Sequence, residues 1–109
     1  MALGIDIVEI SRFKDKEHLV PRLLSPSEQK LYCERANKLE FLAGRFAAKE
    51  AFLKALKKGL GAIPLTAISI LNNEDGVPVL YYQDQQYEVS IAHDGAYAVA
   101  VVHLESKDR

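Results

Sequence analysis

The spacing of hydrophobic residues changes twice along the chain, and each change predicts a different kind of element. Residues 3–10 form an almost continuous apolar, β-branched run that is interrupted at Asp6, which predicts a strand. Residues 25–58 show the spacing of helices. Beyond them, short segments rich in valine, isoleucine and tyrosine alternate with turn residues. These segments predict a meander of antiparallel strands over residues 67–71, 77–82, 87–92 and 96–103.

A start signal for a first helix lies at Ser25. The serine can cap the helix, Pro26 suits the first helical position, and Glu28 follows three residues after the cap. This combination predicts a capping box, in which each of the two polar side chains binds a backbone N–H of the other. The helix is expected to run to about Ala36.

A longer helix is expected over residues 38–58, with Gly59 as the residue that ends it. A polar connection with room for a short helix occupies residues 11–21, and a turn-rich bridge occupies residues 59–64. The order strand, helices, strands predicts an α+β fold. We expect one domain over residues 1–109, in which the long buried helix packs on a mostly antiparallel sheet.

The long helix is apolar almost all the way round, yet four charges are set into it within residues 41–56. Arg45 and Lys49 fall inside the broad apolar arc, where a simple amphipathic helix would have leucine. Glu50 and Lys54, spaced i and i+4, share the opposite face with small alanines, which leave room for a ligand to approach. Buried charges need partners or a ligand, so this helix is the first candidate for a functional site.

The composition excludes several classes of function and of structural site. The chain has 109 residues, 49% hydrophobic and 27% charged, with a formal net charge of −1. A near-neutral chain gives no case for nucleic-acid binding through the field of the whole protein. Cys33 is the only cysteine, which excludes an intrachain disulfide and a multi-cysteine zinc site. We see no signal peptide and no apolar run of about 18 residues, so no membrane segment and a reducing, cytoplasmic setting are expected.

Four residues are candidates for catalytic or binding roles, because of their side-chain types and their positions in the predicted elements. Asp6 and Glu50, from separate elements, could together hold a hard divalent ion such as Mg²⁺, which commonly takes one or two protein carboxylates. Lys54 could meet negative charge on a leaving phosphate. The pattern alone leaves simpler interpretations open: an exposed i, i+4 pair for Glu50 and Lys54, a strand-end carboxylate for Asp6, and a surface histidine for His93.

Three segments together resemble a known family. They are Gly4-Ile-Asp-Ile-Val-Glu-Ile10 with Arg12, Phe41-Leu-Ala-Gly-Arg-Phe-Ala-Ala-Lys-Glu-Ala-Phe52 with Lys54, and Val89-Ser-Ile-Ala-His93 with Tyr97-Ala-Val-Ala-Val-Val102. In this order and spacing they are similar to the short 4′-phosphopantetheinyl transferases of the holo-acyl-carrier-protein synthase type. The match spans nearly the whole chain, and its middle segment is the most specific.

The resemblance implies an activity and its catalytic residues. Members of the family move the 4′-phosphopantetheine arm of coenzyme A to a serine of apo acyl carrier protein, with adenosine 3′,5′-bisphosphate as the other product. Asp6 and Glu50 match the positions that bind Mg²⁺, with Mn²⁺ as a possible substitute. Glu50 would also be the base, directly or through a water, and Lys54 would assist the leaving group. The implied pathway is fatty-acid biosynthesis.

The resemblance also implies binding surfaces. Arg45, Lys49, Ser90 and His93 match positions that line the coenzyme A cleft. Short members form homotrimers with the clefts between adjacent subunits, so the His93 segment or Arg45 of one copy would complete the site of the next.

Arg12 and Arg22 match basic positions that meet the acidic helix of the carrier protein, although both could be ordinary solvated arginines. Ala62 and Ala92 depart from the family pattern, at positions where a basic residue and a serine are common. The enzyme is favoured, and two further classes stay open beside it: a silent relative that binds coenzyme A or carrier protein without transfer, against which the intact Asp6, Glu50 and Lys54 argue, and a structural oligomer.

Overall fold

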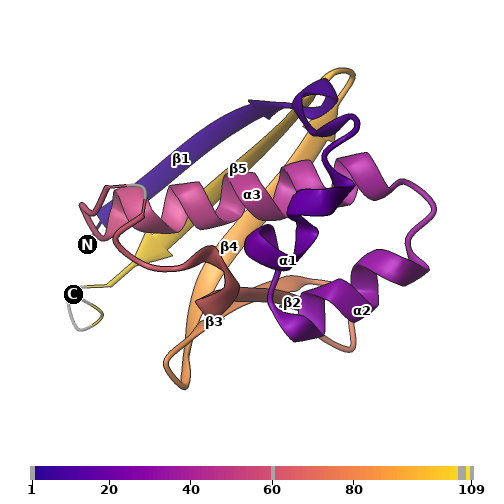
Figure 1. Ribbon diagram of the computed structural model, residues 1–109. Coiled ribbons are helices and arrows are strands. Elements are labelled where there is room, and N and C mark those ends of the chain that lie inside the picture. Colours follow the sequence, from indigo (N-terminus) through magenta and orange to yellow (C-terminus); the bar gives the residue numbers. More distant parts are fainter. Residues whose placement is uncertain (1, 60, 106–107, 109) are drawn as a thin grey trace.

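Five antiparallel strands form one sheet, and the helices cover one of its faces (Figure 1). The computed structural model describes residues 2–59, 61–105 and 108. In chain order the elements are β1 (Ala2–Glu9), the 3₁₀ turns η1 (Ile10–Phe13) and η2 (Glu17–Leu19), α1 (Val20–Leu23), α2 (Pro26–Glu34), α3 (Lys38–Ala55), the 3₁₀ turn η3 (Leu65–Ala67), β2 (Ser69–Asn72), β3 (Pro78–Tyr82), β4 (Gln85–Asp94) and β5 (Tyr97–Leu104). The α+β prediction is confirmed.

The sheet has the order β1-β5-β4-β3-β2, so the first strand pairs with the last. Strands β2 to β5 form the predicted meander, and β1 adds to β5 in antiparallel register, with Asp6 opposite Ala100. The two edges of the sheet are therefore β1 and β2. Strand β2 starts later than expected because residues 65–67 form a 3₁₀ turn, and β4 extends beyond its predicted range at both ends.

The capping box is confirmed. The Ser25 hydroxyl accepts a hydrogen bond from the backbone N–H of Glu28, and the Glu28 carboxylate accepts one from the backbone N–H of Ser25. Helix α2 then ends at Glu34, two residues before the expected Ala36. In Figure 1, α1 and α2 lie beside α3 on the same face of the sheet.

The end predicted for the long helix is wrong. Helix α3 stops at Ala55, and the left-handed residue that follows it is Lys57, with φ 61°, rather than Gly59. The backbone N–H of Lys58 donates to the carbonyl of Leu53, and that of Lys57 donates to the carbonyl of Lys54. These two bonds form a Schellman motif. The glycine was a misleading signal because hydrogen bonding to the last carbonyls can fix the end at a lysine.

Helix α3 lies against β1 at close range because Gly4 has no side chain. A Cβ at this position would lie 1.8 Å from the carbonyl oxygen of Ala51 and 2.8 Å from the backbone N of Ala55. Neither atom belongs to a flexible side chain that could yield. The glycine therefore permits the contact that brings Asp6, two residues further along β1, next to the same helix.

Of the residues that the structure describes, none forms a helix on the other face of the sheet, which is apolar along β1 (Figure 1). Strand alternation sends Gly4, Asp6 and Val8 toward α3 and the residues between them outward. The outward side chains include Leu3, Ile5 and Ile7, which are 66%, 60% and 63% exposed. An exposed apolar row of this kind is typical of an interaction surface.

Candidate active site

Asp6, Glu50 and Lys54 come together where β1 crosses α3. The ammonium of Lys54 donates to Asp6 Oδ1 at 3.0 Å and to the backbone carbonyl of Ile5 at 3.1 Å. Glu50 lies one helical turn before Lys54 and makes no hydrogen bond or ion pair with any residue that the structure describes. The i, i+4 ion pair between Glu50 and Lys54 is not formed, because the lysine pairs with the strand instead.

The environment of Glu50 favours its neutral form. Partial burial raises the pKa of the Glu50 carboxyl, and the negative charge of Asp6 raises it further. The positive charges of Lys54 and Arg12 oppose this shift without cancelling it. A carboxylate with a raised pKa is a stronger base, and such perturbed groups are frequent at functional sites.

The space beside these charges is not open on every side. Ala43 and Ala47, the alanines that share the helix face of Glu50 and Lys54, are fully buried in the core. The expectation that small residues leave room for a ligand is therefore wrong at these two positions. Ligand access is from the solvent side, where the Lys54 side chain is 57% exposed.

The donor set fits a magnesium ion that keeps water or phosphate ligands. No group of three or more His, Cys, Asp and Glu side chains with metal-binding geometry occurs within residues 2–59, 61–105 and 108. Two carboxylates, from Asp6 and Glu50, are nevertheless what Mg²⁺ commonly takes from a protein, with the remaining positions filled by water and substrate phosphates. After burial, the negative charge of Asp6 is the next cause of the raised pKa of Glu50, so the two carboxyl groups lie near each other.

Lys49 belongs to the core. Its side chain is 0% exposed, and its ammonium donates to the Glu28 carboxylate and to the carbonyls of Leu23 and Leu65, both at 2.8 Å. Burial lowers the pKa of Lys49, and the paired Glu28 opposes that shift. All three ammonium protons have protein acceptors, so we leave Lys49 out of the coenzyme contacts proposed below. The sequence reasoning used Glu28 only as a cap and missed this second role.

Arg45 lies on the other side of α3, toward the β2 edge. Its Nε donates to the carbonyl of Ile70 at 3.2 Å, one Nη donates to Asn72 Oδ1 at 2.9 Å, and the guanidinium stacks 4.2 Å from the centre of the Phe41 ring. Arg35 donates to the same Asn72 oxygen. Burial lowers the pKa of Arg45 to about 10, so the group stays charged at neutral pH.

The guanidinium of Arg45 keeps one nitrogen for a ligand. No described residue accepts a hydrogen bond from Nη1. No buried side-chain nitrogen or oxygen of the described residues lacks a partner, so this atom reaches solvent. Neither Arg45 nor Arg35 is within ion-pair distance of a described carboxylate. Glu28, which pairs with Lys49, attracts Arg45 only from a distance, so the two guanidinium groups still offer positive charge to a phosphate. The roles of Arg35 and Asn72 could not be read from the sequence, because both depend on tertiary contact.

His93 lies over the first half of α3. Its Nε2 is 3.2 Å from the backbone carbonyl of Glu40, and its Nδ1 is 3.6 Å from the Glu40 carboxylate. A Cβ on Gly44 would lie 2.9 Å from Nε2, so this glycine makes the space for the ring. Because a carbonyl can only accept, Nε2 carries the proton in this arrangement.

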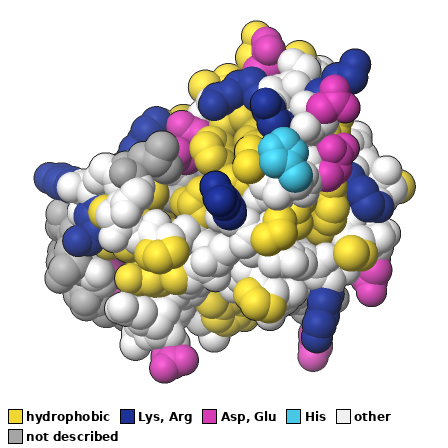
Figure 2. All heavy atoms as spheres, viewed as in Figure 1, with side chains coloured by type: hydrophobic (Ala, Val, Ile, Leu, Met, Phe, Trp, Pro, Cys, Tyr) yellow, Lys and Arg dark blue, Asp and Glu magenta, His cyan; other side chains and the backbone are white. Residues whose placement is uncertain are grey.

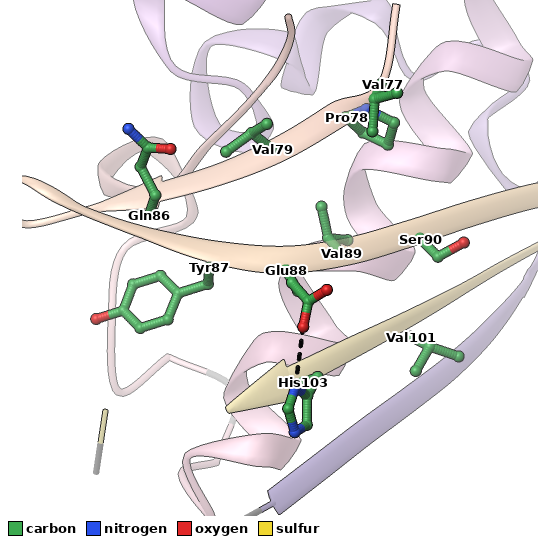
Figure 3. A pocket seen from close by; sticks show the side chains of 10 residues that line it. All are labelled: Val77, Pro78, Val79, Gln86, Tyr87, Glu88, Val89, Ser90, Val101 and His103. Atoms are coloured by element: carbon green, nitrogen blue, oxygen red, sulfur yellow. Dashed lines mark hydrogen bonds and ion pairs between the residues drawn. The ribbon is translucent and has the colours of Figure 1, made fainter. Parts of the chain in front are cut away.

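Ser90 is on the opposite face of the sheet from His93. Odd-numbered residues of β4 such as Val89 and Ile91 pack on the core, and Ser90 points away from it. It lines a hollow of about 490 Å³ formed by β3, β4 and β5 (Figure 3), where His103 and Glu88 pair at 3.0 Å. The chain therefore does not bring Ser90 and His93 to one site within a single copy.

The two predicted carrier-protein residues lie on the helical side. Arg12 is exposed on η1 and is close enough to Glu50 to lower its pKa, and Arg22 is exposed on α1. Figure 2 shows this side with basic and acidic side chains interspersed around apolar ones.

No described helix has the length and hydrophobicity needed to cross a membrane.

Comparison with known proteins identifies the family. The model of the 4′-phosphopantetheinyl transferase superfamily matches residues 2–102. A holo-acyl-carrier-protein synthase of Staphylococcus saprophyticus is 45% identical over 111 residues, which cover 94% of this chain and 96% of the relative. One of Oceanobacillus iheyensis is 40% identical and covers 97% of both chains.

Solved structures agree with the sequence comparison. The crystal structure of a holo-acyl-carrier-protein synthase from Bacillus anthracis, in complex with CoA (3′,5′-ADP), superposes with a TM-score of 0.84 at 34% identity over 93% of this chain and 92% of the other. The Helicobacter pylori synthase in complex with coenzyme A gives 0.81 at 36% identity over 92% and 96%. The chain therefore belongs to the 4′-phosphopantetheinyl transferase superfamily, within its holo-acyl-carrier-protein synthase family of enzymes.

Proposed function

We propose that this protein transfers the 4′-phosphopantetheine group of coenzyme A to a serine of apo acyl carrier protein, with adenosine 3′,5′-bisphosphate as the second product. The observation that carries the proposal is the meeting of Asp6, Glu50 and Lys54 at the crossing of β1 and α3. The named relatives and the CoA complexes of similar structures support the choice of substrates.

Glu50 is the base in this proposal. It has no protein hydrogen-bond partner among the described residues, and its raised pKa strengthens it as a proton acceptor. The serine hydroxyl of the carrier protein gives its proton to this carboxylate, directly or through a water, as the oxygen attacks the phosphorus of coenzyme A. The exposed ammonium of Lys54 is free to turn toward the leaving phosphate and balance its charge.

Asp6 and Glu50 would hold Mg²⁺, or Mn²⁺ in its place. When bound, the ion supplies positive charge that polarises the attacked phosphoryl group and stabilises the leaving phosphate. The Asp6 side chain is 16% exposed, and it faces α3 from a strand fixed by eight backbone pairings. The strand thereby holds one ligand rigidly while the helix presents the other.

Coenzyme A contacts are expected from Arg45 and His93 of a second copy of the chain. Within one copy Arg45 faces the β2 edge, whereas Asp6 is on the β1 edge. Glu50 follows Arg45 by five positions along α3, which places the two side chains about 140° apart around the helix axis. One copy cannot aim both groups at one phosphate, and a neighbouring copy can. We therefore retain the homotrimer with clefts between subunits as a proposal, with Ser90 on the sheet face that its copies would cover.

Arg12 and Arg22 are the proposed contacts for the carrier protein. Both are exposed, Arg12 on η1 and Arg22 on α1, and they lie on the same side of the sheet as Glu50. An acidic partner helix would be guided by such charges. The fatty-acid pathway and a cytoplasmic location rest on the resemblance alone and stay predictions.

Intact-mass measurement of a carrier protein tests the proposed reaction. The protein is incubated with apo acyl carrier protein, coenzyme A and magnesium, and we expect the carrier to gain the mass of one phosphopantetheine. A chelator added beforehand should abolish the gain. An unchanged carrier with coenzyme A bound would identify a silent binder, and the absence of any coenzyme A binding would leave the structural oligomer.

A further inference from the structure

The ammonium of Lys54 occupies the position of a cation at the predicted metal site. It is the only hydrogen-bond partner of the Asp6 carboxylate among the described residues, and it lies 3.0 Å from Oδ1. Glu50, the second predicted metal ligand, lies one turn before Lys54 on the same helix face. The lysine therefore already neutralises the carboxylate that a divalent ion would need.

The geometry also shows that this lysine can leave. More than half of its side chain is exposed, and its other acceptor is a single carbonyl, that of Ile5. Exposed ion pairs of lysine are weak, and the four-carbon stem gives the ammonium several positions. Lys49, five residues earlier on α3, is the contrast, since its three acceptors and full burial fix it in place.

We propose that Lys54 is a built-in counter-ion that competes with the divalent metal for Asp6, and that metal binding releases its ammonium for the substrate phosphate. This inference rests on the proposed function and adds a regulation of the same site. Without metal, Asp6 holds the Lys54 ammonium, which is then not available to a phosphate. With metal, the carboxylates are neutralised and the lysine turns outward.

The proposal predicts an unusual pair of effects for Lys54→Gln. Removing the ammonium removes both the competitor for Asp6 and the repulsion of a divalent ion. A divalent and a monovalent cation a few ångströms apart in water repel enough to change affinity about tenfold, and loss of the competitor acts in the same direction. Metal affinity should therefore rise by about tenfold, while the rate of transfer at saturating metal falls.

The affinity is measured with Mn²⁺ alone, in the absence of coenzyme A, from the electron paramagnetic resonance signal of the free ion. Lys58→Gln is the matched control. It removes the same charge from an exposed lysine just beyond the same helix, at a residue whose side chain has no partner among the described residues. It should leave the Mn²⁺ affinity unchanged. In an Asp6→Asn background, Lys54→Gln should no longer tighten binding, because the shared carboxylate is gone.

The outcomes separate this inference from the proposed function. If Asp6→Asn does not weaken Mn²⁺ binding, the metal site itself is misplaced. If Asp6→Asn weakens it but Lys54→Gln leaves it equal or weaker, the site stands and the competition is disproved. If neither the unaltered protein nor Lys54→Gln binds Mn²⁺ without coenzyme A, the claim that the lysine is what blocks the metal is overturned.

Discussion

Glu50 is the residue whose chemistry conflicts most directly with its surroundings. Burial and the neighbouring Asp6 raise its pKa, so the folded protein holds the proton on this carboxyl more tightly than the unfolded chain does. Stability that depends on this group is therefore greatest at acidic pH and is lost as pH rises through the folded-state pKa. At neutral pH an ionised Glu50 destabilises the fold, as expected of a group placed for function.

Replacing Glu50 with glutamine should therefore stabilise the metal-free protein at pH 7. The amide keeps the shape and carries no charge next to Asp6. The difference in melting temperature from the unaltered protein should shrink as pH falls and vanish below 4.5, the ordinary value for a glutamate, because both proteins are then neutral at this position. Thermal unfolding across this pH range measures it. A variant that is less stable at pH 7 would contradict the interpretation of the site.

Replacement of Lys49 should instead destabilise the protein. Removal of one partner from a buried ion pair leaves the other charge uncompensated, and Glu28 cannot reach solvent. Lys49→Met should cost about 3–5 kcal/mol of unfolding free energy, measured by urea titration. Coenzyme A affinity per folded molecule should be unchanged. A stable variant that had lost coenzyme A binding would restore the lysine to the coenzyme cleft where the resemblance puts it.

At the scale of elements, the fold depends on how closely β1 approaches α3. Gly4 permits the contact, and the alanines of α3 provide the flat surface that receives the strand. The distance between the Asp6 and Glu50 carboxylates is set by this packing rather than by either element alone. A glycine on a strand can therefore act on the active site without touching a ligand.

Gly4→Ala should push β1 away from α3. The added Cβ would meet the Ala51 carbonyl oxygen at 1.8 Å, so the strand must move. We expect a loss of about 1–3 kcal/mol or more in unfolding free energy and weaker Mn²⁺ binding in the protein that stays folded. Gly59→Ala is the control, since apart from its chain neighbours no atom of the described residues lies within 4 Å of its Cβ position. Equal metal affinity in Gly4→Ala and the unaltered protein would show that the close approach does not position Asp6.

Many of the helices and strands could be predicted from the sequence, because they depend on local signals. The capping box at Ser25, the strand periodicity after residue 67 and the apolar long helix all lie within short windows. The end of α3 was misjudged because Lys57 adopts the left-handed conformation that glycine usually takes. Contacts between distant segments could not be predicted, such as Lys49 with Glu28 or Arg45 with Asn72. Only the fold brings them together.

At the scale of the whole molecule, two features favour an oligomer: the exposed apolar face of the sheet, and proposed site residues that lie toward opposite edges of the sheet. Leu3, Ile5 and Ile7 are exposed on the face that no helix covers, and Val101 of β5 lies opposite Ile5 on that face. Arg45 and Asp6 are directed toward opposite edges of the sheet. An oligomer would bury the apolar row and bring the edges of neighbouring copies together.

Ile5→Glu should disrupt that assembly. A charge at the centre of the apolar row would have to be buried in the interface, which is costly without a partner. The molar mass from light scattering should fall from that of a trimer to that of a monomer, and transfer activity should be lost with it. Ser27→Glu adds the same charge to an exposed position on α2 and should leave the mass unchanged. A monomeric unaltered protein that is fully active would refute the shared site.

The role of Glu50 as base and metal ligand is tested most directly by the transfer rate of Glu50→Gln. The rate is measured from the intact mass of the carrier protein at saturating magnesium and coenzyme A. Glu34→Gln, an exposed glutamate at the end of α2, is the control. We expect Glu50→Gln to be folded, more stable at pH 7, and slower by on the order of 10² or more, because general-base catalysis is lost. A near-normal rate would contradict the assignment of Glu50 as base and metal ligand.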